Sequence, residues 1–268
     1  MTDRERYAYP VESATKMVYF VHGYGDPSGR YLEFAEYLNK HGISFYTHDL
    51  AGHGKSGPVD GMMAHCENFS DYEDEVINEI TSIKTRNPQY QKVVLLGHSM
   101  GGLVAFRVAN RIQLSGLVLS APLLEFNKNS APVLSSIVTL LASIAPNLYF
   151  PFDFSKPEWF SGDPDVQQES REDKYMWQGS PRFGHALKIL DAVDKSRMLW
   201  KYHNTRTVIF HSPDDMLTKI DGSRALSAAR PDMVTLHEVS NTCHGLLKDA
   251  WEVRSGTYAL FLEAIQSF

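Results

Sequence analysis

The chain has 268 residues with a hydrophobic content of 43%, which is ordinary for a globular protein and excludes collagen-like, coiled-coil and disordered classes. Its 26 Lys and Arg residues against 32 Asp and Glu residues give a formal net charge of −6. Because no Lys/Arg-rich run accompanies this charge, nucleic acid is not expected as the main partner, and two cysteines are too few for a disulfide framework.

The predicted elements alternate between strands and helices along most of the chain. Short apolar runs predict strands at 17–21, 43–48, 92–96 and 117–119, and later at 207–210 and 234–239. Helical spacing of apolar residues predicts helices near 31–38, 72–83, 100–111 and 246–265, the second of them after a capping box at Ser70–Glu73. This alternation predicts an α/β protein with a mostly parallel sheet and helices on both faces.

One long segment breaks the alternation. Residues 123–205 show no strand pattern and are rich in Pro, Ser, Trp and Phe. We interpret this segment as a helical cap inserted into a core made of residues 1–122 and 206–268.

The residues 97–101, Gly-His-Ser-Met-Gly, follow a predicted strand and precede a predicted helix. They satisfy the G-x-S-x-G pattern of a nucleophile elbow, where a strained serine stands on a sharp turn. Glycines are needed there because neighbouring backbone approaches the serine closely, and the helix amino terminus favours developing negative charge. Ser99 is therefore the predicted nucleophile, and the alternative is a glycine cluster that serves helix packing.

A serine nucleophile needs a base that is itself oriented by an acid. In this topology the acid follows a late strand and the histidine follows the last strand. The late strand runs into Asp214 and Asp215, and the last strand runs into His244. We predict His244 as the base and, from its spacing to the strand end, Asp214 as the acid, with Asp215 as the competitor and Asp221 as a more distant one.

An oxyanion hole needs two backbone N–H donors. Met100, directly after the nucleophile, is expected to supply one. The loop 22–25, His-Gly-Tyr-Gly, follows the first predicted strand, and Tyr24 is the candidate for the second donor. The alternative for this loop is a plain glycine turn.

Together these motifs resemble those of the α/β-hydrolase superfamily, and more closely its monoacylglycerol lipase and lysophospholipase branch. The resemblance covers nearly the whole chain from about Met17 and is carried by residues 22–25, 28–31, 48–56, 97–102 and 120–123 and by the surroundings of Asp214 and His244. It implies the α/β-hydrolase fold, a triad of Ser99, Asp214 and His244, and oxyanion donors at Tyr24 and Met100. It also implies that Arg30 lies near the polar head of the substrate, although Asp26-Pro27 replaces the Glu-His that the family often has there.

The inserted segment bears on the substrate. Apolar residues from Val133 to Ile144 predict a helix that is apolar over more than half its circumference. This helix either packs on the core or lines an acyl-chain tunnel and touches lipid with its outer face. Trp159, Phe160, Trp177 and Phe183 either wall a pocket or fill the cap's own core.

These observations predict a serine hydrolase that cleaves carboxylic esters of long-chain acyl lipids through an acyl-enzyme. The substrate is expected to be a small lipid-like ester, either monoacylglycerol or lysophospholipid. The competing hypotheses are a thioesterase, a peptidase or another small-ester hydrolase with the same triad, and a ligand-binding receptor with little turnover.

The remaining patterns predict no cofactor and no metal. The Gly54-Lys55-Ser56 triplet is similar to the end of a phosphate-binding loop, but Asp49 stands where that motif requires its first glycine. Without a signal-peptide pattern or a spanning segment, we expect a cytoplasmic protein, with peripheral membrane contact through the cap left open. Cys243, beside His244, either makes the protein sensitive to thiol reagents or simply fills its loop.

Overall fold

The computed structural model describes residues 4–125, 139–150 and 156–268. A seven-stranded sheet in the order β1-β3-β2-β4-β5-β6-β7 forms its centre. The strands are β1 (Arg6–Tyr9), β2 (Lys16–Val21), β3 (Ser44–His48), β4 (Lys92–His98), β5 (Gly116–Ser120), β6 (Thr207–His211) and β7 (Val234–Glu238). β1 pairs antiparallel with β3, and the other neighbouring strands pair in parallel.

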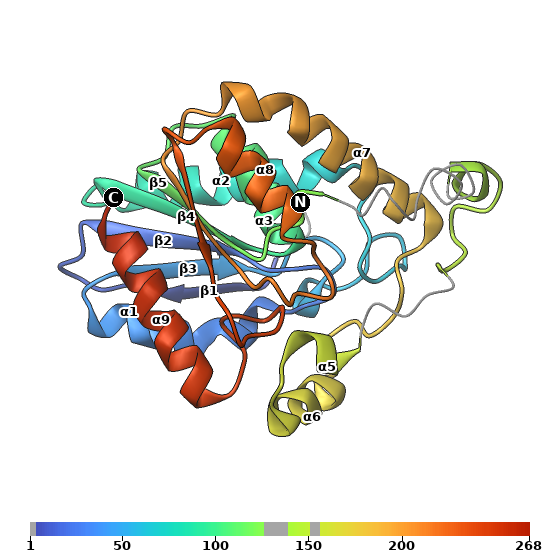
Figure 1. Ribbon diagram of the computed structural model, residues 1–268, viewed down its shortest axis with the longest axis horizontal. Helices are drawn as coiled ribbons and strands as arrows, with labels where there is room; N and C mark the ends of the chain where they lie inside the picture. The colour runs from blue at the N-terminus through green and yellow to red at the C-terminus, as the bar shows by residue number, and fades with distance from the viewer. Residues whose placement is uncertain (1–3, 126–138, 151–155) are drawn as a thin grey trace.

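Helices cover both faces of this sheet (Figure 1). One face carries α1 (Leu32–Lys40) and α9 (Trp251–Gln266), and the other carries α2 (Phe69–Arg86), α3 (Met100–Ala109) and α8 (Asp221–Ala229). β2 shows why both faces close, since Met17, Tyr19 and Val21 join the apolar cluster under α2 and α3. Val18 and Phe20 join the cluster under α1 and α9. The fold class predicted from the alternation is confirmed.

Several element boundaries differ from the predictions. β1 and α8 were not predicted, and α2 begins at Phe69, one turn earlier than expected. Asn68, not Ser70, precedes the first turn of α2, and its N–H donates to the Asp71 carboxylate over 2.9 Å. The last helix begins at Trp251 because Leu246 and Leu247, which belong to a loop, fill the core beside it.

The inserted segment contributes α5 (Pro157–Phe160), α6 (Pro164–Glu172), α7 (Phe183–Leu199) and a helical stretch at 139–144. α7 packs against α2 and α3, whereas α5 and α6 pack on one another. We call residues 157–172 the α5–α6 arm (Figure 1). Val133 and the other residues before 139 in the predicted apolar helix lie outside the described residues.

In the described part of the chain, short 3-10 helices occupy three connections: η1 (Ser28–Tyr31), η2 (Gly54–Ser56) and η4 (Trp200–Tyr202). η2 is part of the fold rather than a phosphate loop, because the Lys55 N–H donates to the Asp49 carboxylate over 2.8 Å and the Ser56 hydroxyl donates to the Asp49 carbonyl over 2.7 Å. The Ser28 backbone N–H donates to the same carboxylate over 2.7 Å, which joins η1 to η2.

The carboxyl ends of the parallel strands meet at one edge of the sheet. His98 at the end of β4 pairs with Ser120 at the end of β5, and Gly97 pairs with Val21 at the end of β2. Ligands of open α/β sheets bind at this edge. Among the described residues, no helix has the length and apolar content needed to cross a bilayer.

Candidate active site

Ser99 occupies a strained turn between β4 and α3. Its backbone has φ 55° and ψ −122°, a positive φ that L-residues rarely adopt. The turn needs glycine around it, because a Cβ on Gly97 would lie 2.3 Å from the Gly101 carbonyl oxygen and one on Gly101 would lie 2.2 Å from the His22 carbonyl oxygen. Such strain persists at functional sites where the surrounding structure holds it in place. The geometry agrees with the nucleophile elbow predicted from the motif.

This crowding gives a stability prediction. Gly101→Ala pushes a methyl group into backbone atoms that cannot rotate away, so we expect the free energy of unfolding to fall by about 3 kcal/mol. Gly256→Ala is the matched control, because nothing lies within 4 Å of the added Cβ in α9. Alanine is the better helix former, so this control should gain about 0.5–1 kcal/mol. Urea unfolding of both variants checks the pair, and equal stability of Gly101→Ala and wild type would contradict the crowded turn.

The acid beside His244 is Asp215, and the prediction of Asp214 is corrected. The Asp215 Oδ2 accepts a hydrogen bond from His244 Nδ1 over 2.6 Å, and Asp215 is 3% exposed. Asp214 is exposed, and its backbone N–H donates to the Ser212 hydroxyl over 3.2 Å. The turn after β6 therefore directs the first aspartate to solvent and the second into the sheet edge. Asp221, the third candidate, lies at the start of α8 and is also exposed.

The Asp215 carboxylate is held from several sides. Its Oδ1 accepts the backbone N–H groups of Leu217 and Thr218 over 2.7 and 3.0 Å, and its Oδ2 accepts the Thr218 hydroxyl over 2.9 Å. Burial alone would raise the pKa of Asp215, but the attraction of His244 and hydrogen bonds from His211, His244 and Thr218 outweigh it and hold this pKa well below its usual range. The carboxylate is thus ionised and oriented toward Nδ1 of the histidine.

His244 is buried with one ring nitrogen engaged and the other not. Nδ1 contacts Asp215, whereas Nε2 has no hydrogen-bond partner among the described residues. The His98 and Phe160 rings flank the imidazole, with ring centroids 4.7 and 5.6 Å away. Burial, followed by repulsion from His244, holds the pKa of His98 well below its ordinary value, so this neighbour stays neutral. A general base in an unliganded site often gains its last hydrogen bond only with substrate.

The predicted oxyanion donors lie on either side of Ser99. Met100 is the first residue of α3, and the loop after β2 passes so close that a Cβ on Gly23 would be 3.1 Å from the Ser99 Cβ. The next residue, Tyr24, places its ring between the core and the cap, 5.9 Å from the His53 ring and 5.7 Å from the His185 ring on α7. The loop after β2 and the start of α3 therefore both lie beside Ser99, and the donor roles of Tyr24 and Met100 stay a prediction.

Arg30 joins the core to the cap. Its guanidinium donates to the Ser170 hydroxyl of α6 over 2.7 Å and lies 3.8 Å from the Asp26 carboxylate. The Trp177 N–H, also from the inserted segment, donates to the Gly25 carbonyl over 2.8 Å. The loop that follows β2 and the 3-10 helix η1 are therefore hydrogen-bonded to the inserted segment. Arg30 and Asp26 line a small cavity together with His98, Phe160, Gly245 and Lys248.

The other predicted aromatic residues of the cap have separate places. Phe160 faces His244, and Phe183 packs on Phe150 with ring centroids 5.3 Å apart. Trp177 stacks on Tyr149 with ring centroids 6.0 Å apart. Sequence reasoning named Asp215 only as the competitor of Asp214, and it did not single out Thr218, His98 or Lys248. The sequence holds no signal that separates Asp215 from Asp214, because N–H groups two and three residues later are available to both.

Comparisons with known proteins identify the family and the fold. The sequence profile of the family described as serine aminopeptidase, S33, matches residues 12–250. A monoglyceride lipase homolog of monkeypox virus is 30% identical over 81% of this chain and 77% of its own, and a phospholipase of Bacillus subtilis is 30% identical over 70% and 71%. The crystal structure of a monoacylglycerol lipase from Paleococcus ferrophilus superposes with a TM-score of 0.85 over 99% of both chains at 23% identity. The chain therefore belongs to the S33 family of α/β-hydrolases, on the branch that includes the monoglyceride lipases.

Proposed function

We propose that the protein is a serine carboxylic-ester hydrolase of acyl lipids. The observation that carries this proposal is the buried Asp215–His244 hydrogen bond of 2.6 Å at the sheet edge that also bears the strained Ser99 turn. Ser99 attacks the acyl carbonyl while His244 takes the hydroxyl proton and Asp215 stabilises the imidazolium. His244 then gives that proton to the leaving alcohol. Water activated by His244 releases the fatty acid from the acyl-enzyme.

The backbone N–H groups of Met100 and Tyr24 are the proposed oxyanion donors. Met100 directly follows Ser99, and Tyr24 follows Gly23 in the loop beside it. Electrostatic stabilisation of the oxyanion is usually the largest single contribution to such catalysis. Residues 123–205 form the proposed cap, and the apolar residues that its sequence concentrates between Val133 and Ile144 favour a long acyl chain.

A panel of substrates tests this function. Rates are measured for a long-chain monoacylglycerol, lysophosphatidylcholine, a short-chain ester, an acyl-CoA and a peptide amide. We expect the long-chain monoesters to have the highest kcat/KM. A higher kcat/KM for the acyl-CoA or the amide would replace the proposal by a thioesterase or peptidase, and binding without turnover would replace it by a receptor.

Lys248 favours a second candidate substrate, an acyl lipid with a phosphate in its head group. Its side chain lines the cavity with Arg30 and Asp26. The Lys248 ammonium makes no hydrogen bond or ion pair within the described residues, and burial followed by repulsion from Arg30 lowers its pKa. Within the cavity lining two cations, Arg30 and Lys248, face the single carboxylate of Asp26, while Glu169 attracts Lys248 from outside the lining. The excess of positive charge in the lining suits an anionic phosphate better than glycerol alone. The cavity holds about 20 Å³ with the cap in this position, room for about one water molecule, so a head group enters only if the cap shifts.

Lys248→Met tests the phosphate-bearing head group. The kcat/KM for lysophosphatidic acid relative to monoacylglycerol of the same chain length should fall about tenfold, as expected from one lost hydrogen bond to a charged group. Lys174→Met, which removes an exposed cation of the cap, should leave this ratio unchanged. An unchanged ratio in Lys248→Met would favour neutral monoacylglycerol as the substrate.

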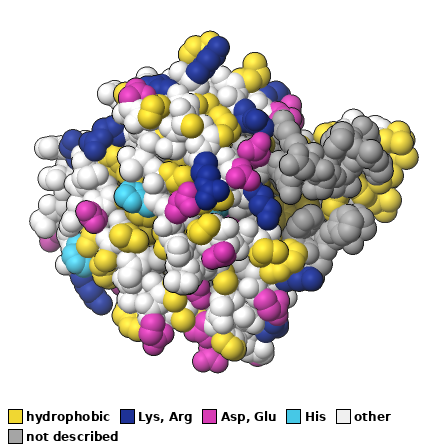
Figure 2. Space-filling model, in the orientation of Figure 1, with side chains coloured by type: hydrophobic (Ala, Val, Ile, Leu, Met, Phe, Trp, Pro, Cys, Tyr) yellow, Lys and Arg dark blue, Asp and Glu magenta, His cyan; other side chains and the backbone are white. Residues whose placement is uncertain are grey.

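Contact with lipid surfaces is proposed for the protruding end of the cap. Leu140, Ile144, Leu148 and Tyr149 expose 60%, 69%, 58% and 47% of their surface. Figure 2 shows hydrophobic side chains gathered at this end of the molecule, beside residues drawn in grey. Leu140 and Ile144 are four residues apart in a helical stretch and therefore share one face. Such exposed apolar patches typically mark membrane or protein contacts.

The double change Leu140→Ser and Ile144→Ser tests this surface. Burial of each side chain in the lipid interface contributes about 1.5–3 kcal/mol at most, so partial burial of both predicts a loss of about tenfold in binding to phosphatidylcholine vesicles. Cosedimentation measures the binding. Met198→Ser, at the far end of α7 and also strongly exposed, is the control and should bind as wild type does. Equal binding of the double variant and wild type would show that another surface meets the lipid.

A further inference from the structure

The loop that carries His244 is hydrogen-bonded to the cap. The His244 N–H donates to the Trp159 carbonyl over 3.1 Å, and the Gly245 N–H donates to the Phe160 carbonyl over 2.8 Å. Trp159 and Phe160 end the first helix of the α5–α6 arm. The backbone of the candidate base is thus paired with the inserted segment, although its side chain is paired with the core through Asp215.

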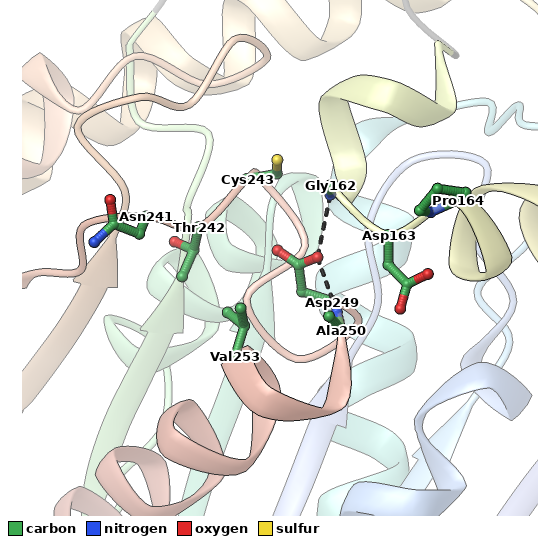
Figure 3. A pocket seen from close by; sticks show the side chains of 9 residues that line it. All are labelled: Gly162, Asp163, Pro164, Asn241, Thr242, Cys243, Asp249, Ala250 and Val253. Atoms are coloured by element: carbon green, nitrogen blue, oxygen red, sulfur yellow. Dashed lines mark hydrogen bonds between the residues drawn. The ribbon is translucent and has the colours of Figure 1, made fainter.

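A buried carboxylate strengthens this junction. Asp249 lies five residues after His244 and is 3% exposed. Its Oδ1 accepts the Ser161 hydroxyl over 2.7 Å, the Gly162 N–H over 3.1 Å and the Ala250 N–H over 2.9 Å. Figure 3 shows the carboxylate between the arm and the start of α9, with two of these hydrogen bonds drawn. Asp249 therefore ties the His244 loop to the arm at a second point, with Ser161 itself 1% exposed.

The backbones of the arm and the His244 loop are closely packed at this junction. A Cβ on Gly245 would lie 2.7 Å from the Phe160 carbonyl oxygen, so only glycine permits the close approach of the two backbones. The Phe160 ring meets the His244 ring nearly edge-on, with 74° between the ring planes. Because close-packed elements move together, a displacement of the arm has to move the His244 backbone.

From these contacts we infer that Asp249 is a positioning residue that couples the α5–α6 arm to His244. With the arm seated, His244 is held between Asp215 on the core side and the Trp159–Phe160 carbonyls on the cap side. With the arm displaced, the loop loses these anchors, and the His244 ring loses the orientation that the arm and Asp215 give it together. A misplacement of about 1 Å in a reacting group costs about 100-fold in rate. The inference rests on the proposed role of His244 as the base.

A groove beside this junction gives the experiment a second readout. A cavity of about 480 Å³ lies between the arm and the loop. Its lining residues include Asp163, Cys243, Asp249 and Val253 (Figure 3). Cys243 is partly exposed there, whereas Cys66 is buried. The alkylation rate of Cys243 by N-ethylmaleimide therefore reports how firmly the arm sits on the loop, without any need for turnover.

The test compares Asp249→Ala, Asp249→Asn and Ser161→Ala with Asp163→Asn. Asp163 belongs to the same groove but only caps α6, accepting the Asp165 N–H over 2.8 Å, a role that Asn also fills. Asp249→Ala should lower kcat about 10- to 100-fold, the loss typical when a residue that orients a functional side chain is removed. KM should change less than about twofold. Asp249→Asn keeps an acceptor oxygen and should recover part of that loss. Ser161→Ala should lower kcat about threefold to tenfold, the loss expected when one hydrogen bond is removed.

Each outcome decides for or against the coupling. Alkylation of Cys243 should quicken in the same order as kcat falls, while Asp163→Asn matches wild type in both. Circular dichroism and thermal melting establish that each variant is folded, and Ser161→Ala decides the matter if Asp249→Ala does not fold. If the folded variants keep the wild-type kcat, or change in KM alone, the coupling is overturned. Failure of wild type itself to hydrolyse any ester would overturn the proposed function instead.

Discussion

Asp215→Asn should lower kcat for ester hydrolysis by about 10⁴-fold, as replacement of the acid does in other serine triads. The reason is the 2.6 Å contact between the Asp215 Oδ2 and His244 Nδ1. An amide at this place cannot stabilise the imidazolium and favours the wrong tautomer of the neutral ring, in which Nε2 carries the proton. Steady-state hydrolysis of a long-chain monoacylglycerol measures the loss.

Asp214→Asn is the matched control for this change. Its side chain is exposed, and exposed substitutions usually change the free energy of folding by less than about 0.5 kcal/mol, so kcat should stay within about twofold of wild type. The two adjacent residues are chemically identical, which makes the comparison one of position alone. A large loss in Asp214→Asn together with a small loss in Asp215→Asn would reverse the assignment of the acid.

Ser99→Ala should lower kcat by about 10⁶-fold, the loss seen when a triad nucleophile is removed. The residue stands at φ 55° in the turn between β4 and α3. Because the alanine methyl is smaller than the serine side chain, substrate should still bind. Fluorescence titration with a long-chain lipid ester measures this affinity. It should remain within about threefold of the wild-type affinity, because ground-state binding of the substrate does not depend on the nucleophile.

A modest drop in kcat for folded Ser99→Ala would contradict the nucleophile assignment. Contamination by another esterase is controlled by purifying the Ser99→Ala and His244→Ala variants side by side. Both variants should show the same residual rate, because the members of a triad act as a unit and their losses do not add.

The sequence was informative where local pattern and chemistry coincide. The strand, the glycines and the helix around Ser99 are contiguous, and therefore the turn was predictable. His244 followed from the order of elements, since the loop after the last strand carries it. The parallel sheet followed from buried runs such as Val93–Leu96, all of them buried in the structure.

Other features depend on contacts that local pattern does not encode. Asp214 and Asp215 share one turn, and which of them enters the sheet edge is decided by the N–H groups of Leu217 and Thr218 that bind the second carboxylate. β1 is a short strand of mixed exposure, so its sequence lacks a buried run. Leu246 and Leu247 resemble the start of the last helix but are buried as part of a loop.

The proposed cap is distinguished from the core by its composition, but its contacts are not readable from the sequence. Pro- and aromatic-rich composition distinguishes residues 123–205 from the core, yet composition does not reveal that Trp159 and Phe160 pair with the His244 loop. Asp249 likewise resembles an ordinary acidic residue ahead of a helix. Its role depends on Ser161 and Gly162, which lie almost ninety positions earlier in the chain.

Labelling with a long-chain alkyl fluorophosphonate, followed by peptide mapping with mass spectrometry, tests whether Ser99 is an activated nucleophile. Such reagents phosphonylate a serine only where a base and an oxyanion hole activate it. We expect one adduct per chain, located on Ser99, that is absent from Ser99→Ala and formed far more slowly in Asp215→Asn than in Asp214→Asn. A folded wild-type protein that takes up no label, or an adduct on another residue that persists in Ser99→Ala, would contradict this expectation.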